Sequence, residues 1–161
     1  MNVYIEEFLL FSKVRYYTIR LEDQEDSETD LFIDRFIASS EFRDELGIIR
    51  YWLEEIGTHR GAIQADSDDL FRTKKGTVRA LPPPFEFGNR LRLYGVICSD
   101  DIVILGGGGR KTTRVAQDGD TAVAFDLIQQ VAAAVRKAIK SGSIALGQRQ
   151  LTGRFHQLTL S

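Results

Sequence analysis

The second half of the sequence carries a set of basic side chains around an expected β-strand over residues 90–99. Side chains alternate between the two faces of a strand, so Arg92 and Tyr94 are expected on the same face. Arg and Lys bind phosphate oxygens, and one guanidinium can donate to two of them. The complete set is Lys74, Lys75, Arg79, Arg90, Arg92, Arg110, Lys111 and Arg114. These residues predict a surface that binds phosphodiesters.

The charge of the chain is divided unevenly along its length. Residues 1–70 hold 7 Lys or Arg against 17 Asp or Glu, whereas residues 71–161 hold 14 against 6. The net charge is nevertheless only −2. This asymmetry indicates a basic surface in the second half, suited to phosphates or to an acidic partner. The alternative is that the two halves pair with each other in the fold.

Other catalytic chemistry has little support in the sequence. His59 and His156 are the two histidines, and neither is spaced with Cys98 as a zinc site requires, so we expect no metal and no cofactor. Residues 105–112 (LGGGGRKT) look like a phosphate-binding loop, but an Arg stands where the second Gly of that motif belongs. A cysteine inside an apolar strand is more often a small core residue than a nucleophile.

The composition is that of an ordinary globular protein. The 161 residues are 43% apolar and 27% charged, which excludes wholesale disorder and disulfide scaffolds. We expect one domain over residues 1–161. No apolar run approaches the roughly 20 residues that span a bilayer, and the N-terminus has no basic start typical of a secretory signal. With a single cysteine, a cytoplasmic location without a membrane partner is expected.

In the first half, residues 13–22 alternate as a strand, and residues 3–11 fit either an extra strand or a short helix. Ser27 and Asp30 have the spacing of a capping box, which predicts a helix over about 28–38. A second helix is expected over about 41–56, capped by Ser40. A loop is expected over 58–69.

In the second half, residues 70–81 indicate one strand or a loose hairpin, and the prolines at 82–84 must leave the sheet. Residues 90–99 and 101–105 predict an antiparallel hairpin, followed by four glycines. A final helix is expected from about 118–120 to 141, and a tail that could add a strand at 155–160. The fold class is therefore α+β: an N-terminal strand and two helices, an antiparallel sheet of about four strands, a C-terminal helix and a short tail.

At this hairpin the chain resembles the RelE/HigB/ParE superfamily of bacterial type II toxin–antitoxin toxins. The resemblance runs from Asn89 to about Lys140, over LRLYGV, DDIVILGGGGRKT and the final helix. The order of secondary-structure elements agrees over most of the chain, and the sequence motif covers about a third of it. It implies a RelE-like α+β domain and a toxin that is silenced by an antitoxin protein encoded by a neighbouring gene.

The resemblance also implies a reaction, namely metal-independent cleavage of messenger RNA at the ribosome. The ribose 2′-OH attacks the adjacent phosphate, which requires alignment, charge stabilisation and proton transfer. Arg92 and Lys111 would stabilise the transition state, and Tyr94 would transfer a proton. The residues expected to hold neighbouring RNA phosphates are Arg79, Arg90, Arg110, Lys74, Lys75 and Arg114.

Two alternatives stay open at this point. ParE-type relatives poison gyrase rather than cut RNA, and the hairpin motif does not separate the two activities. The same fold could also serve as a non-catalytic module that binds nucleic acid or protein through its basic face, in which case binding would depend on salt without any cleavage.

Overall fold

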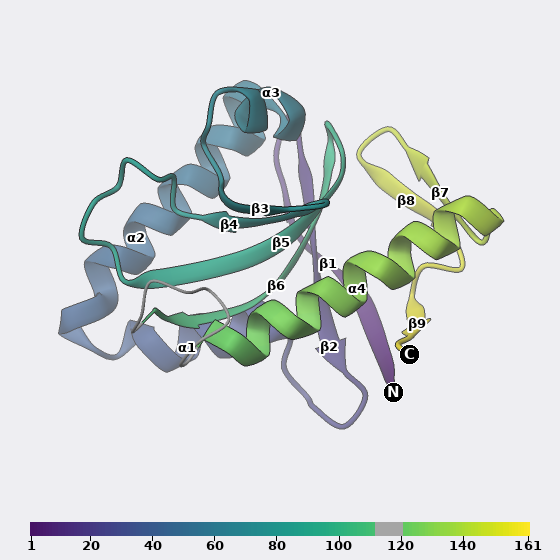
Figure 1. The fold of residues 1–161 in the computed structure, drawn as a ribbon, viewed down its shortest axis with the longest axis horizontal. Coiled ribbons are helices and arrows are strands. Elements are labelled where there is room, and N and C mark those ends of the chain that lie inside the picture. Colours follow the sequence, from purple (N-terminus) through teal and green to yellow (C-terminus); the bar gives the residue numbers. More distant parts are fainter. Residues whose placement is uncertain (112–120) are drawn as a thin grey trace.

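The computed structural model describes residues 1–111 and 121–161 and shows a twisted seven-stranded sheet with helices on both faces (Figure 1). The elements are β1 (Asn2–Leu10), β2 (Arg15–Leu21), α1 (Glu28–Ile37), α2 (Ser40–Glu55), a π-helical turn (Ile56–Arg60), α3 (Ala62–Ser67), β3 (Arg72–Lys75), β4 (Val78–Leu81), β5 (Leu91–Ser99), β6 (Ile102–Arg110), α4 (Ala122–Ser141), β7 (Ile144–Gly147), β8 (Gln150–Gly153) and β9 (Gln157–Thr159). The expected α+β class is confirmed.

The strand order in the large sheet is β3-β4-β5-β6-β2-β1-β9, and β7 and β8 form a separate two-stranded sheet. Strands β2 and β6 run parallel, with Arg15 beside Ile102 and Thr18 beside Leu105. The other neighbouring strands are antiparallel. The N-terminal hairpin is therefore joined to the β3–β6 meander through the parallel pair at the middle of the sheet.

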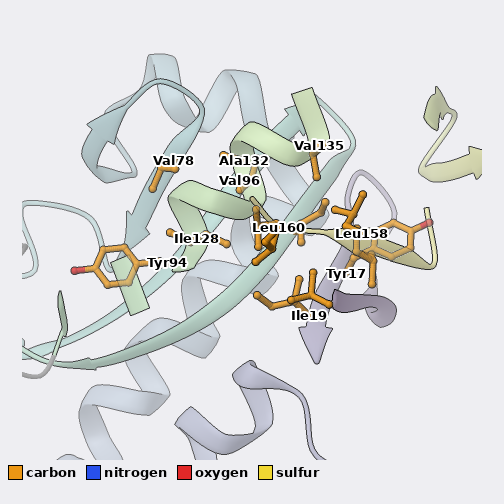
Figure 2. Close-up of a cluster of buried hydrophobic side chains, with 14 of the residues drawn as sticks. Tyr17, Ile19, Val78, Tyr94, Val96, Ile128, Ala132, Val135, Leu158 and Leu160 are labelled. Carbon is orange, nitrogen blue, oxygen red and sulfur yellow. The ribbon is translucent and has the colours of Figure 1, made fainter. Parts of the chain in front are cut away.

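Each face of the sheet buries its own hydrophobic core. Figure 2 shows part of the core beneath α4, where Ile128 and Val135 of the helix lie with Ile19 and Val96 of the strands. The β7–β8 hairpin adds to this same core. The opposite core lies beneath the N-terminal helices α1, α2 and α3 and contains Phe32, Phe36, Phe42, Leu53 and Leu93. Figure 1 shows α4 crossing one face of the sheet while these helices lie behind the other.

Local signals explain where several elements begin and how their residues face. The Ser27 hydroxyl accepts the backbone N–H of Asp30 at 3.1 Å and donates to its carboxylate at 3.0 Å, so the predicted start of α1 is confirmed. Helix α2 begins one residue earlier than expected, with Ser39 rather than Ser40 at the N-cap position. The predicted hairpin around residues 99–101 is confirmed as β5–β6, and residues 70–81 form the hairpin β3–β4.

The expected sheet of about four strands is too small. Residues 3–11, left open between strand and helix, form β1, and the tail supplies β9 as well as the unexpected hairpin β7–β8. The loop expected over 58–69 is instead the π-helical turn and α3. Short elements of this kind are held by distant partners, for example Ala62, whose N–H donates to the Asp100 carbonyl at 2.7 Å. The hydrophobic periodicity of a short segment cannot predict hydrogen bonds to residues that are distant in sequence.

The four glycines at 106–109 lie inside β6 rather than after it. A Cβ on Gly106 would lie 2.9 Å from the Ile128 side chain of α4, and a Cβ on Gly108 would overlap the backbone carbonyl of Arg92 and meet Phe32 of α1. Helices on both faces and the neighbouring strand therefore approach β6 more closely than side chains would allow. The run of glycines permits this packing rather than ending the strand.

We predict that Gly108→Ala destabilises the protein strongly, because the added methyl group meets the backbone of β5 as well as the side chain of Phe32. The expected loss is about 3 kcal/mol in the free energy of unfolding, measured by urea denaturation. Gly47→Ala is the matched control. Gly47 lies in α2, where an added Cβ would meet nothing within 4 Å, so that variant should gain about 0.5–1 kcal/mol. Equal stability of the two variants would contradict the close approach at β6.

Candidate anion-binding site

Strand β5 presents Arg92 and Tyr94 to the face of the sheet that α4 covers. Leu91 and Leu93 belong to the core beneath α1 and α2, whereas Tyr94 and Val96 belong to the core beneath α4, so the predicted alternation of β5 is confirmed. Arg92 is only 8% exposed and Tyr94 only 1% exposed. The strand thus carries a cation and a phenol into the interior.

Within residues 1–111 and 121–161, the guanidinium of Arg92 is hydrogen-bonded to neutral groups. Its Nη1 donates to the carbonyl oxygens of Asn89 at 2.6 Å and Leu91 at 2.9 Å. Its buried Nε has no hydrogen-bond partner within residues 1–111 and 121–161. Burial, followed by the nearby positive charge of Arg72, lowers the pKa of Arg92 to about 10. A desolvated cation of this kind is stabilised by any anion that reaches it.

Arg72 is the second cation of the site, and it was not among the residues singled out in the sequence. The strand register places Arg72 opposite Ala80, and Ala80 opposite Tyr94, so the three residues form one row across β3, β4 and β5. Arg72 donates from Nε to the Pro82 carbonyl at 2.7 Å and from Nη2 to the Pro83 carbonyl at 2.6 Å. Burial lowers the pKa of this guanidinium too.

Lys111 completes what we call the cationic site, defined as Arg72, Arg92 and Lys111. Its backbone N–H donates to the Arg90 carbonyl at 2.8 Å, which holds the residue beside the start of β5. Burial, and then the positive charges of Arg92 and Arg72, lower the pKa of the Lys111 ammonium. The positive charges of the three residues therefore repel one another, which is unfavourable unless an anion joins them.

Tyr94 borders the cationic site but is poorly suited to accept a proton. Its ring packs on Phe125 in the first turn of α4, with 5.5 Å between the ring centroids, and its hydroxyl is hydrogen-bonded to the Thr121 side chain. Figure 2 shows this hydroxyl pointing away from the other labelled core residues. Burial raises the pKa of Tyr94, so the phenol stays protonated at neutral pH and is available as a hydrogen-bond donor.

Two carboxylates act on the arginines from a distance while binding other groups. The negative charge of Glu86 partly offsets the lowering of the Arg72 pKa, but the Oε2 of Glu86 accepts the indole N–H of Trp52 at 3.3 Å. Glu45 partly offsets the lowering of the Arg92 pKa in the same way, yet it forms an ion pair with Arg90 at 2.9 Å. In the part of the chain that the structure describes, no carboxylate forms an ion pair with the cationic site.

Three of the other six basic residues expected in the site contact acids of the first half instead. Arg79 binds Asp66 at 2.7 Å. Lys74 binds Asp69 at 3.1 Å and also contacts Asp66. Arg90 binds Glu41 as well as Glu45, at 2.6 and 2.9 Å. The alternative that the two halves pair electrostatically therefore describes these three cations, and the expectation that they join Arg92 on one surface is not met.

The remaining predicted residues are placed as follows. Arg110 lies over the ring of Phe42, 5.8 Å from its centroid, so it faces the α1–α2 side of the sheet rather than Arg92. Lys75 is exposed at the end of β3. Arg114, and the expected helix start at 118–120, lie outside the described residues. Of the predicted set, Arg92, Tyr94 and Lys111 come together.

Two further features of the described residues bear on the class of site. No group of three or more His, Cys, Asp or Glu side chains in residues 1–111 and 121–161 is arranged to hold a metal ion. None of the described helices has both the length and the apolar character needed to cross a bilayer. Comparisons with family models, with curated proteins and with solved structures found no match to this chain.

We predict that inorganic phosphate stabilises the protein through the cationic site. At a phosphate concentration tenfold above Kd, the stabilisation is about 1.4 kcal/mol, which raises Tm by about 3–6 °C for a chain of this size. The measurement is thermal unfolding in phosphate against chloride at equal ionic strength. Lys137→Met, which removes an exposed cation near the end of α4, is the control and should respond like the unaltered protein.

Lys111→Met should be more stable than the unaltered protein in chloride, but phosphate should stabilise it less. Because burial and the neighbouring cations lower the pKa of Lys111 below the usual 10.5, the charged form destabilises the fold at neutral pH, and this penalty is relieved only as pH rises through the folded-state pKa. The variant should therefore have a higher Tm in chloride and a smaller rise in phosphate. An unchanged rise would contradict an anion site at Lys111, since a general effect of phosphate on hydration would act on both proteins equally.

The reactivity of Cys98 tests whether this half-buried residue belongs to the core beneath α4. Burial raises the pKa of this thiol to about 12, so the reactive thiolate is scarce in the folded protein at pH 8. We expect iodoacetamide to label Cys98 at least tenfold more slowly in the native protein than in urea. Native labelling as fast as in urea would instead indicate an activated cysteine.

Proposed function

We propose that this chain is a metal-independent endoribonuclease, the toxin of a toxin–antitoxin pair, whose phosphodiester site is the cationic site. The observation that carries the proposal is the placement of three cations on neighbouring strands: Arg72 lies in one row with Tyr94, two residues after Arg92 on β5, and Lys111 is hydrogen-bonded to the Arg90 carbonyl at the start of β5. Among the described residues, no carboxylate forms an ion pair with them. Among the described residues, the two guanidiniums donate to backbone carbonyl groups, and the buried Nε of Arg92 has no partner there. A phosphodiester in contact with these groups would relieve their repulsion.

The order of elements supports the same proposal. The toxins that the chain resembles have a strand, two helices, an antiparallel meander with an Arg-bearing strand, a basic segment and a helix. Here β2, α1, α2, β4, β5, β6 and α4 occur in that order, with the π-helical turn, α3 and β3 inserted between α2 and β4. Arg92 lies on β5, the third strand of the β3–β6 meander, and Lys111 directly follows its last strand, β6.

The residues of the site suit the charge changes of RNA cleavage. When the ribose 2′-oxygen bonds to the adjacent phosphorus, negative charge grows on the phosphoryl oxygens before the bond to the 5′-oxygen breaks. Arg92 and Arg72 would stabilise that charge in a partly desolvated site. Lys111, whose pKa is lowered, would donate a proton to the departing 5′-oxygen and regain one from water. The proton of the 2′-hydroxyl would leave to water, and the products would be a 2′,3′-cyclic phosphate and a 5′-hydroxyl.

The protonation state of Tyr94 favours a second candidate, a non-catalytic RNA-binding module. Burial keeps this phenol protonated, and the described residues of the cationic site are all proton donors at neutral pH. A site of donors without a proton acceptor binds phosphates more readily than it removes a proton from a ribose. In this case binding and its salt dependence would remain, and the RNA would stay intact.

The test of the proposed function is inducible expression in a bacterial host, with mapping of messenger RNA ends. We expect growth arrest and cleaved messages, and a loss of both in Arg72→Gln and Lys111→Met. For purified protein on ribosome-bound RNA in EDTA, cleavage by each variant should fall about 100-fold or more, as for the loss of one preorganised donor. Arg72 and Lys111 are substituted because they are only half-buried, whereas Arg92 is buried.

Lys137→Met is the matched control in this experiment and should arrest growth like the unaltered chain. Normal growth and intact RNA, in cells that contain soluble protein with an unaltered Tm, would contradict the endoribonuclease. If purified protein then binds RNA in a salt-dependent manner, the non-catalytic module is the correct assignment. An antitoxin would be recognised by co-expression of the adjacent gene, which should restore growth.

A further inference from the structure

The segment between β4 and β5 exposes two aromatic rings to solvent. Phe87 is 91% exposed and Phe85 is 48% exposed. Backbone hydrogen bonds shape the segment, since the Glu86 N–H donates to the Pro83 carbonyl and the Phe87 N–H donates to the Phe85 carbonyl, each at 3.0 Å. Rings held in water on an ordered segment indicate a surface used for binding.

Helix α2 adds two more rings beside this segment. The rings of Trp52 and Phe85 meet edge to face with centroids 5.5 Å apart, and Tyr51 meets Trp52 in the same way at 5.1 Å. Tyr51 is 56% exposed. We call Tyr51, Trp52, Phe85 and Phe87 the aromatic platform. Figure 1 shows the segment between β4 and β5 running beside α2 at the end of the sheet where β5 begins.

The segment that carries Phe85 and Phe87 is hydrogen-bonded to one residue of the cationic site. Arg72 donates to the carbonyl oxygens of Pro82 and Pro83, three and two residues before Phe85. Glu86 of the same segment accepts the Trp52 indole N–H at 3.3 Å, and its negative charge partly offsets the lowering of the Arg72 pKa. The residue that holds the segment in place is therefore one of the three cations proposed to hold a phosphate.

We propose that the aromatic platform stacks unpaired bases of an RNA strand whose phosphate lies at the cationic site, with Phe87 as the principal stacking ring. This inference rests on the proposed function and adds a base subsite to it. Aromatic side chains next to cations match the two parts of a single-stranded nucleic acid, namely flat bases and charged phosphates. A purely apolar protein partner would leave the adjacent cationic site without a counter-charge.

Trp52 makes the inference measurable, because it is the single tryptophan of the chain and belongs to the platform. The probes are a 2′-O-methyl oligoadenylate, which cannot be cleaved through a 2′-hydroxyl, and an abasic oligomer with the same number of phosphates. We expect the oligoadenylate to bind more tightly and to quench Trp52 fluorescence. Phe87→Ala should raise Kd for the oligoadenylate about fivefold or more and leave Kd for the abasic oligomer unchanged.

Two control variants separate stacking from other effects. Ile63→Ala removes a 55%-exposed apolar side chain from α3 and should bind both oligomers like the unaltered protein. Lys111→Met should weaken binding of both oligomers by the same factor, since it acts on the phosphate.

The outcomes distinguish this inference from the proposed function. Equal affinity for the two oligomers, or equal binding of oligoadenylate by Phe87→Ala and the unaltered protein, would overturn stacking while the phosphate site stands. The platform would then be assigned to a protein contact. If Phe87→Ala weakened the binding of both oligomers by the same factor, stacking at Phe87 would also be overturned. Failure of the unaltered protein to bind either oligomer would overturn the proposed function itself.

Discussion

The close approach of β6 to its neighbours on three sides is the constraint on which the rest of the fold depends. Gly106 leaves room for Ile128 of α4, and Gly108 leaves room for Phe32 of α1 and for the backbone of β5. A buried chain of hydrogen bonds fixes the same region, since Thr29 donates to the Gly106 carbonyl at 2.8 Å and its hydroxyl meets that of Thr18 at 2.6 Å. Helix α1, the parallel strands β2 and β6, and the end of β6 that leads to Lys111 are thereby fixed together.

The basic residues of the second half fall into two groups, those that form ion pairs with the acidic first half and those of the cationic site. Several cations of the second half are neutralised by acids of the first half, as Arg79 is by Asp66 and Arg90 is by Glu45. These contacts join the sheet to the helices and the segments that follow them. Arg72 and Arg92 instead donate to backbone carbonyl groups. Among the described residues, the charged groups that act on Lys111 are these two arginines. The same stretch of basic sequence thus supplies both the cations that join the elements of the fold and the cations of the proposed binding site.

Much of the local structure could be predicted from the sequence, because its causes are local. The alternation of β5 assigned Arg92 and Tyr94 to one face, and the Ser27 cap located the start of α1. The parallel pairing of β2 with β6 could not be predicted in this way, because it joins residues separated by more than eighty positions. Arg72 was missed for the same reason. Its place beside Tyr94 depends on the register of three strands, and its nearest sequence neighbours give no sign of it.

The outer edge of the sheet joins the two ends of the chain. Strand β1 pairs with β9, the Leu160 N–H donates to the Met1 carbonyl at 2.8 Å, and the Ile5 N–H donates to the His156 carbonyl at 2.9 Å. During synthesis β1 is made well before β9, so one side of β1 stays unpaired while the intervening residues are made. Pairing across so long a separation in sequence slows folding. An exposed strand edge meanwhile invites association with other chains, so β9 acts as a late closure that protects the sheet once it arrives.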